Sequence, residues 1–593
     1  MQTVRIPFVG SYNQRGLAGS ADLTANLDQR YLNCTFDVVR NPITDKLTLY
    51  VQRRPGWSTD SLVAAGSAST GCIHPQSFNA TLSAFGETNS VIYYGQSSVG
   101  TITGRALHFT ETIVGGVSYV MLKSSDGTGW YYADGAKDTT AYTMDGNNST
   151  TVTDLKVGGV SSVSGLYSGQ KLTAATNIPA GTRIVSVNAG AFTAVLDTAT
   201  TGGAFNDLAV TKEPIAKILD ADFNTSGTAI SAFVEMDGYL FYTTDNGNIW
   251  NSDLNSVTSF AATSFVNPNM APDPPVAIAR SQNAVIVFGS GSKEVFQNAG
   301  LATGSPLQRV PQYFERIGCL DQRSVTTIEN TIYFVSTPFE GDVGVFALDG
   351  LKATRVSTPA IDRIIGTVGT GDAVYAASFR LGGYPYAAFS LSSAADGPAS
   401  MRLLESGDFR LLEDGVSYRL LEDTPGQTAS FIRMMVYNSF LKVWSEWDCN
   451  QATFIDGISS GTANQLIATS RMNTSGKVYT ISPTSNGEVW QDDGTTFPCE
   501  VRTARVDMGT GKRKFIHGMR LISDQQTAGT VSMYFSDDNY ATWKGPFVFN
   551  LNEARPQVQR LGSHWAGRAY KFIHQYNGPF RAEAFEIDFS VEE

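Results

Sequence analysis

Residues 233–361 repeat one pattern three times: an apolar strand, a tight turn, a second apolar strand and a polar link. The three units begin at Phe233, Val276 and Val325. In the first unit, Asp237-Gly238 and Asn246-Gly247 are dipeptides that accept the positive φ of hairpin turns. No helical pattern separates the units, and strands recurring in this way are typical of β-propeller blades. The repeat therefore predicts an all-β chain built around a propeller.

Composition and charge exclude several kinds of protein. Only 17% of the 593 residues are charged, and the net charge of −12 argues against a surface that grips nucleic-acid phosphates. We expect no secretory signal in the first residues and no membrane helix, because no apolar run approaches ~18 residues. The five cysteines are far apart without metal or redox spacing, which fits folding in a reducing cytoplasm.

The strand pattern predicts four regions. Residues 1–60 are an N-terminal arm or docking segment, and residues 61–99 and 213–490 form the propeller. The blade rhythm stops over residues 100–212, which predicts an inserted β-module, a tolerable addition because doubling a loop costs only ~0.6 kcal/mol. Residues 491–593 show about five alternating strands and predict a C-terminal β-sandwich.

Two features of the predicted arm bear on its role. A short helix is expected over Ala21–Tyr31, with Ser20 as its N-cap. Arg53 and Arg54 follow a strand-like segment and precede Pro55-Gly56. This arginine pair could contact an acidic partner, although a turn beside a strand end is the favoured interpretation.

A short internal repeat lies between two predicted propeller strands. Three copies of Arg-Leu-Leu-Glu are spaced eight and nine residues apart, and Gly407 and Gly415 oppose a continuous helix. The repeat is either a meander that extends one blade or a tip that lines or plugs a channel. As a candidate channel gate it comprises Arg402, Leu403, Leu404, Arg410, Leu411, Leu412, Arg419, Leu420 and Leu421.

Two segments imitate the Asp-box turn of sialidase-like propellers, Ser/Thr-x-Asp-x-Gly-x-Thr-Trp. The first carries Thr243, Asp245, Gly247 and Trp250, with Ile in place of the second Thr. The second carries Ser536, Asp538 and Trp543, with Tyr540 in place of the glycine. The carboxylate of such a turn caps backbone N–H groups while the Trp packs behind it, so the motif stabilises a hairpin and performs no catalysis.

The sequence assigns no catalytic, cofactor-binding or metal-binding residue. A glycosidase needs two carboxylates at a defined separation, and nothing singles out a pair. The histidines lack metal-ligand spacing, and there is neither a nucleophile elbow nor a phosphate-binding loop. The basic turn Lys512-Arg513-Lys514 could touch phosphate or an acidic neighbour, but a solvated turn is favoured. We therefore expect a protein that is not an enzyme.

Three stretches taken together resemble the packaged-DNA-stabilisation, or tail hub/nozzle, proteins of short-tailed bacteriophages. The order and spacing of these stretches match the family over most of the chain outside 100–212 and 400–425. They are Asn26–Asn33 with Arg54-Pro-Gly56, then Val285–Gln297 with Tyr313–Cys319, then Val531–Trp543 with Gln559–Gly562 and Tyr570–Phe589.

The resemblance implies a structural protein of the virion tail, assembled in the host cytoplasm as a homohexamer. It would sit below the portal and the adaptor, or head-to-tail connector, ring and contact a tail fibre, spike or needle protein. It would line the DNA ejection conduit and help to retain packaged DNA. Double-stranded DNA would pass without sequence-specific binding. The acidic balance fits if the excess faces the lumen, because like-charged walls cannot accumulate phosphate contacts.

Two questions stay open at this level. Retention needs a closure, which is either the repeat at 402–423 or a separate plug protein. The alternative function is a tail-associated propeller that binds or cleaves glycans at the host surface. That alternative requires an aromatic-lined pocket with two facing carboxylates.

Overall fold

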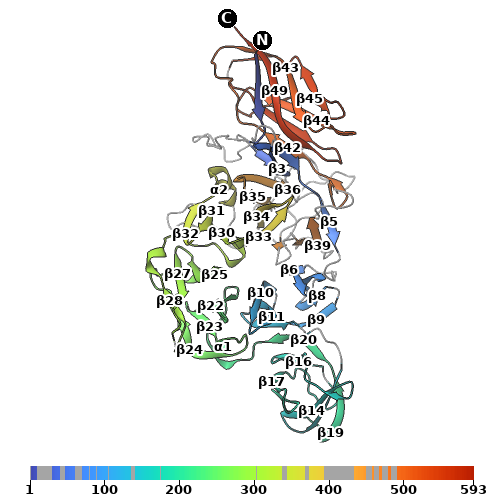
Figure 1. Ribbon diagram of the computed structural model, residues 1–593, viewed down its shortest axis with the longest axis vertical. Coiled ribbons are helices and arrows are strands. Elements are labelled where there is room, and N and C mark those ends of the chain that lie inside the picture. The colour runs from blue at the N-terminus through green and yellow to red at the C-terminus, as the bar shows by residue number, and fades with distance from the viewer. Residues whose placement is uncertain are drawn as a thin grey trace, which may run out of the picture.

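The structure is a computed structural model, and its parts follow one another along the longest axis. Figure 1 shows the C-terminal sandwich at one end, the propeller in the middle and the inserted module at the other end. The structure describes residues 2–9, 30–40, 47–60, 70–78, 81–88, 90–95, 97–104, 106–134, 136, 141–173, 175–301, 303–336, 343–366, 373–392, 433–448, 457–459, 467–469, 478–481, 490–565 and 567–592.

Seven blades of four antiparallel strands form the propeller within these residues, and the strands of blades 1 to 6 follow chain order from the inside outward. Blade 1 is β6 (Thr70–Phe78), β7 (Thr81–Thr88), β8 (Val91–Tyr94) and β9 (Ser97–Thr101). Blade 2 is β10 (Ala106–Val114), β11 (Val117–Ser124), β12 (Gly129–Ala133) and β20 (Lys212–Lys217), with β16 (Gln170–Leu172) added at its edge. Blade 3 is β21 (Val234–Met236), β22 (Tyr239–Thr243), β23 (Ile249–Ser252) and β24 (Phe260–Val266).

Blades 4 to 6 follow the same order. Blade 4 is β25 (Pro275–Ser281), β26 (Ala284–Gly289), β27 (Lys293–Asn298) and β28 (Leu307–Arg309). Blade 5 is β29 (Val325–Ile328), β30 (Thr331–Ser336), β31 (Gly344–Asp349) and β32 (Lys352–Arg355). Blade 6 is β33 (Ala373–Leu381), β34 (Tyr384–Ser392), β35 (Arg433–Asn438) and β36 (Val443–Asp448). Blade 7 is β37 (Gly457–Ser459), β38 (Ile467–Thr469), β39 (Val478–Ile481) and β5 (Trp57–Asp60).

The ring is closed by a strand from the other end of the chain. β5 is the outer strand of blade 7, where Trp57 pairs with Ile481 and Asp60 with Val478. β37 and β38 in turn contact β6 of blade 1. The propeller predicted at 61–99 and 213–490 therefore also needs residues 57–60. Pairing between distant segments replaces an open edge with backbone hydrogen bonds.

Turn chemistry and burial explain the repeated units. Asp237 and Gly238 join β21 to β22 with φ of 55° and 83°, the geometry of a two-residue hairpin. All six residues of β26 are buried, because neighbouring blades cover both faces of this sheet. That burial is why the strand reads as a continuous apolar run. The repeated pattern at 233–361 thus corresponds to blades 3, 4 and 5.

The inserted module is smaller than the predicted 100–212. Residues 106–133 form three strands of blade 2, and the chain returns to that blade at β20. The module proper has its own apolar core, which includes Tyr142, Val152, Ile184 and Val210. Its strands are β13 (Tyr142–Asn147), β14 (Thr151–Val157), β15 (Val160–Ser161), β17 (Ile184–Asn188), β18 (Thr193–Leu196) and β19 (Ala204–Val210).

The N-terminal residues are not a separate arm. The first sheet of the sandwich pairs β3 (Cys34–Arg40) and β4 (Leu47–Arg53) with β49 (Arg581–Val591), β43 (Lys514–Ser523) and β46 (Gln557–Gln559), and adds β1 (Gln2–Pro7) and β47 (Ser563–His564). The second continues from β36 of blade 6 through β2 (Arg30–Leu32), β42 (Cys499–Arg502), β48 (Ala569–His574), β44 (Thr530–Ser536) and β45 (Lys544–Asn550). Ile6, Phe8 and Phe36 lie in one core with Phe572 and Phe585, so the sandwich needs both chain ends.

Few helices interrupt the strands of the described residues. They are α1 (Ala221–Thr225), α2 (Pro359–Ile365) and the 3-10 turns η1 (Pro311–Tyr313) and η2 (Gln322–Ser324), while β40 (Gln491–Asp492) and β41 (Thr495–Thr496) form a small hairpin. The helix predicted over Ala21–Tyr31 falls largely outside the described residues. Its last two residues are the start of β2, where Arg30 and Tyr31 pair with Arg502 and Val501. Within the described chain no helix is long and apolar enough to span a membrane.

Candidate functional site

The Arg-Leu-Leu-Glu repeat lies outside the described residues, but the strands that flank it do not. Leu391 of β34 pairs with Arg433 of β35, so the connection containing the repeat leaves blade 6 between its second and third strands. The inserted module instead joins the third and fourth strands of blade 2. Because strands alternate in direction, these two connections start from opposite faces of the propeller.

The first Asp-box-like turn joins β22 to β23 and has a structural role. Its carboxylate, Asp245, accepts the backbone N–H of Thr228 at 2.9 Å, so it ties the turn to a neighbouring segment. The turn itself is capped by Asn246, whose Oδ1 accepts from Thr244 and Asn248. Trp250 is 6% exposed and packs on Phe265 at 4.8 Å. The prediction that the aspartate caps its own turn is therefore wrong here.

The second Asp-box-like turn, between β44 and β45, follows the predicted geometry. Asp538 accepts the hydroxyl of Ser536 at 2.8 Å and the backbone N–H of Thr542 at 2.9 Å. The hydrogen bonds from Thr542 and Ser536 lower the pKa of Asp538 to about 2. Tyr540, which replaces the glycine, adopts φ 68° and rests edge-on against Trp543.

This turn belongs to a cluster of three loops, residues 503–513, 537–543 and 561–568, which we call the outer loops. Arg505 donates to the carbonyl of Gly567 at 3.1 Å and to Asn539. Arg568 is buried and binds Asp537 at 2.7 Å. Lys514, just after the first loop, pairs with Val591 near the C-terminus, so the outer loops lie at the end of the sandwich that carries both termini (Figure 1).

Charge is unevenly distributed along the chain. Residues 501–571, which include the outer loops, contain eleven Lys and Arg and five Asp and Glu, a net charge of +6. Residues 61–490, the propeller and its insertion, contain twenty-four Lys and Arg and thirty-seven Asp and Glu, a net charge of −13. The outer loops by themselves contain four Lys and Arg and three Asp, a net charge of +1, and residues 572–593 contain one Arg and five Asp and Glu.

The surface beside the outer loops combines cationic and aromatic groups. Trp565 is 61% exposed and Phe515 is 36% exposed. The guanidinium of Arg513 lies over both rings, 5.1 Å from the centroid of Phe515 and 5.6 Å from that of Trp565. Trp and Arg are the residue types enriched at the energetic centres of protein interfaces. The turn 512–514 therefore contributes Arg513 to a surface of cationic and aromatic side chains. The sequence analysis predicted only a solvated turn.

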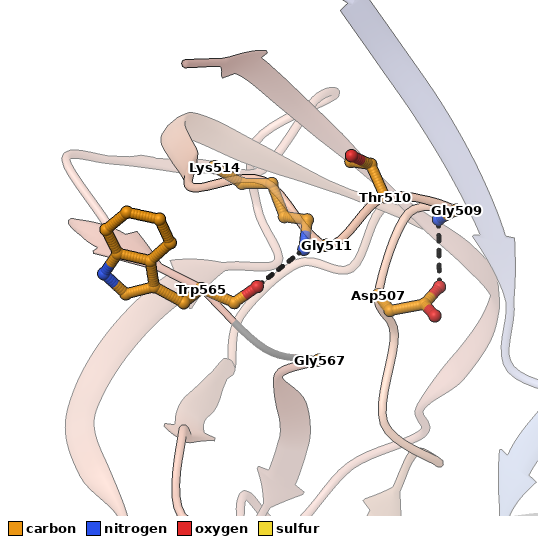
Figure 2. Close-up of a pocket in the computed structure, with 7 residues that line it drawn as sticks. All are labelled: Asp507, Gly509, Thr510, Gly511, Lys514, Trp565 and Gly567. Carbon is orange, nitrogen blue, oxygen red and sulfur yellow. Dashed lines mark hydrogen bonds between the residues drawn. The ribbon is translucent and has the colours of Figure 1, made fainter.

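A shallow pocket of about 380 Å³ opens among the outer loops. Figure 2 shows its lining residues, with the indole of Trp565 projecting away from Asp507 and Thr510. Lys514 is buried and donates to the carbonyl of Trp565 at 2.9 Å, and Asp507 accepts the N–H of Gly509 at 2.9 Å. Both charged groups hold the loops in place. With one carboxylate in its lining, the pocket does not supply the carboxylate pair of a glycosidase.

A second group of charged residues lies inside the propeller. Arg323 and Asp321, beside η2 of blade 5, form a two-pronged ion pair at 2.9 and 2.7 Å. Asp321 and Arg323 interact electrostatically with His108 and Lys123 of blade 2. Blades 2 and 5 are not neighbours in the ring, so this electrostatic influence acts across it.

Burial governs the protonation of these central groups. It lowers the pKa of His108 to about 3 and that of Lys123 to about 8. Gln322 of η2 also exchanges hydrogen bonds with the backbone of Ile278 in blade 4, at 2.8 and 3.1 Å. These hydrogen bonds tie blade 5 to blade 4 near the inner strands of the ring.

The arginine pair near the start of the chain is buried rather than available to a partner. Arg53 donates to the carbonyls of Phe497 and Tyr576, both at 2.7 Å. Arg54 binds the carboxylate of Asp492. The acidic partner of Arg54 is therefore Asp492 of the same chain, at the point where the propeller meets the sandwich.

Three aspartates in the inserted module approach metal-ligand spacing. The carboxylates of Asp145, Asp154 and Asp207 lie within 4.8 Å of one another. Lys156 pairs with both Asp154 and Asp207, and Asp145 accepts the backbone N–H of Asp207 at 2.7 Å. The protein's own donors thus balance these carboxylates, and we assign no metal to them.

The fold defines a seven-bladed β-propeller protein with a fused β-sandwich. Residues 126–378, somewhat less than half of the chain, match the model of the family described as Bacteriophage P22 Gp10, beta-propeller. This match supports a structural protein of the phage tail-stabilisation type that is a component of the virion. No curated protein matches the sequence.

Several solved structures are similar at low identity. BBS1N in complex with ARL6DN is 10% identical and has a TM-score of 0.31, covering 73% of this chain and 99% of that chain. The exo-beta-1,3-galactanase of Phanerochaete chrysosporium is 9% identical at a TM-score of 0.24, covering 61% and 97%. The endosialidase of phage phi92 is 11% identical at 0.24, covering 92% and 72%. At these TM-scores the likeness carries no argument for activity or substrate.

Proposed function

We propose that the protein forms the tail nozzle or hub as a homohexamer below the portal and adaptor rings, where it lines the DNA ejection conduit and helps to retain packaged DNA. The observation that carries the proposal is the Gp10 family match over residues 126–378. The charged cluster around Asp321 and Lys123 is consistent with it. In this assembly the conduit for duplex DNA would run between copies of the chain, around the axis of the hexamer.

The uneven distribution of charge suggests how the copies meet. A contact between two different surfaces of the same chain generates a closed ring when its rotation closes. The surface around Lys512 and Arg513 of one copy and the acidic propeller of the next are complementary surfaces of this kind. We place the contact at Arg513 and Trp565, with Trp565 as the aromatic anchor. The acidic excess of residues 61–490 that stays uncovered would face the lumen, where it lets DNA slide.

The proposed hexamer would contact other tail proteins. The adaptor ring would lie above the hexamer, and a tail fibre, spike or needle protein below it. Assembly would take place in the host cytoplasm. Closure of the conduit would be provided by the repeat at 402–423 or by a separate plug, and deletion of 402–423 distinguishes them. Virions that leak DNA would support the repeat, whereas normal retention and infectivity would assign closure to the plug.

Electron microscopy of the intact tail, reconstructed first without imposed symmetry, tests the proposal. We expect six copies around a DNA-wide channel, with the outer loops of each copy against its neighbour's propeller. A channel lined by Lys and Arg would contradict the sliding mechanism. Copies placed off the axis and exposed to the host surface would instead favour the glycan-binding alternative, which a glycan array with the purified protein would then examine.

A further inference from the structure

Two cysteines that are remote in sequence lie side by side in the structure. The Sγ atoms of Cys34 and Cys499 are 3.5 Å apart, although 465 residues separate them along the chain. Both residues are buried, each with 1% exposure. Cys34 is the first residue of β3 and Cys499 the first residue of β42. The tertiary structure thus makes a thiol pair that the sequence spacing does not suggest.

The backbone holds this pair in register. β2 pairs with β42 through Leu32 and Glu500, directly beside the two cysteines. The side-chain amide of Asn33 donates to the carbonyl of Pro498 at 2.8 Å, and the indole of Trp447 donates to the carbonyl of Cys34 at 3.0 Å. A disulfide bond is about 2.05 Å long, so the sulfurs must approach by only about 1.5 Å. Side-chain rotation can supply a movement of this size while the strands stay paired.

We propose that Cys34 and Cys499 are a site of covalent modification, at which the folded protein forms an intramolecular disulfide on exposure to a small-molecule disulfide. One cysteine thiolate attacks the reagent RSSR, which gives a mixed disulfide and releases RS⁻. The second thiolate attacks the protein sulfur of this mixed disulfide and displaces the second RS⁻. In total, two protein thiols and one RSSR give one protein disulfide and two RSH, so atoms and electrons balance.

The environment of the pair sets the conditions for this reaction. Burial raises the pKa of the Cys34 thiol well above its ordinary value, and Cys34 donates to the carbonyl of Leu32 at 3.3 Å. Because the thiolate is the nucleophile, the pair reacts slowly at neutral pH and faster as the pH rises. Local opening of the strand ends admits the reagent.

The position of the bond gives it a specific consequence. All seven blades, from β5 at Trp57 to β39 at Ile481, lie between the two cysteines. A bond between Cys34 and Cys499 would close a covalent loop around the entire propeller, whose ring is otherwise closed by the hydrogen bonds of β5. Cross-links that close long loops restrict the unfolded chain most strongly. The oxidised protein should therefore unfold at a higher temperature than the reduced one.

The test uses the purified full-length chain. The native protein is incubated at about pH 8.5 with oxidised glutathione, remaining thiols are blocked, and peptides are mapped by mass spectrometry without reduction. We expect loss of two of the five thiols, a linked peptide pair containing Cys34 and Cys499, and a rise in Tm of about 5 °C that a reductant reverses.

Cys319 provides the matched control. It is equally buried, but its sulfur contacts the hydroxyl of Ser324 at 3.4 Å and the carbonyl of Asp321 at 3.3 Å. Cys319→Ser should keep the linked peptide and the rise in Tm, whereas Cys34→Ser and Cys499→Ser should lose both. The proposal is overturned if Cys34 and Cys499 both stay free in the native wild-type protein, or if either links to a different cysteine. Peptide mapping of the wild-type chain gives this answer even if a variant fails to fold.

Discussion

The guanidinium of Arg54 makes two hydrogen bonds to the carboxylate of Asp492, at 2.9 and 2.6 Å, with side-chain exposures of 0% and 7%. Asp492 also accepts the backbone N–H of Trp57, the first residue of the strand that closes the propeller, at 2.9 Å. Arg54 further donates to Asn33, which lies between β2 and β3 of the sandwich. This one ion pair therefore couples closure of the ring to attachment of the sandwich.

Removing one partner of this pair should be costly. Arg54→Ala leaves the carboxylate of Asp492 buried without its counter-charge, and breaking a buried pair in this way costs about 3–5 kcal/mol. Denaturant unfolding followed by Trp fluorescence should show a free energy of unfolding that is lower by this amount. Arg380→Ala, which removes an exposed ion pair with Glu329, is the control and should cost about 1 kcal/mol or less. Equal effects of the two variants would refute the coupling role.

Trp57 should be essential for ring closure. Its side chain is fully buried in a core with Phe379, Trp447 and Tyr479, which come from blades 6 and 7. Trp57→Ala removes this contact and should destabilise the protein by about 3–5 kcal/mol. Limited proteolysis should then cut blade 7 earlier than the other blades. Trp565→Ala, at an exposed indole, should leave both unfolding and proteolysis unchanged.

His574 should make the protein less stable in mild acid. Burial, followed by the charge of Arg53, lowers the pKa of His574 to about 3, from an ordinary value of 6.5. Between these values the unfolded state binds more protons than the folded state, so stability falls as the pH drops from about 6.5 towards 3. Thermal unfolding across this range should show a smaller decline in His574→Gln. An identical pH profile would mean that His574 is protonated in the folded protein.

Asp538 should make stability depend on pH in a more acidic range than His574 does. Its folded pKa of about 2 lies below the ordinary value of 3.8, so its contribution is present above about pH 4 and is lost as the pH falls through 2. In Asp538→Asn the stability difference from the wild type should shrink over this range. Asp245→Asn, in the other Asp-box-like turn, serves as the comparison, and tracking thermal unfolding from pH 5 to 2 provides the measurement.

Association of copies should depend on the cations beside the outer loops. Lys512→Glu combined with Arg513→Glu reverses two charges and should weaken self-association about tenfold or more, with the largest effect at low salt. Arg555→Glu, an exposed charge elsewhere on the sandwich, should have little effect. Sedimentation velocity of the purified chain at two salt concentrations gives the result. Equal weakening by both changes would indicate general charge repulsion instead of a defined contact.

The local pattern of residues predicted much of the propeller. Asp237-Gly238 adopts the hairpin turn that its sequence indicates, and the apolar run of β26 is buried on both faces. The hydrogen bonds of the second Asp-box-like turn were also predictable from the sequence, because they join residues within seven positions of one another. Asp245 shows the limit of such reasoning. Its partner is Thr228, and no local rule selects a donor seventeen residues away.

The predicted domain boundaries were wrong where strands pair with partners that are distant in the sequence. Residues 1–60 look like an arm because their partners, β49, β42 and β39, come from the last fifth of the sequence. Residues 106–133 look like part of the insertion because β20 completes their blade only after the module has intervened. Pairing partners of this kind are selected by packing and register, which the strands do not carry individually.

The sequence by itself determined the all-β class, the blade units of residues 233–361 and the resemblance to a phage tail family. These follow from period, turn residues and resemblance, all of which are local properties of the chain. Only the tertiary structure decided that Trp57 closes the ring, that Arg54 meets Asp492, that Cys34 meets Cys499 and that Arg513 lies beside Trp565. The physical reason is that each of these contacts joins side chains separated by tens to hundreds of residues, and burial of a shared core brings them together.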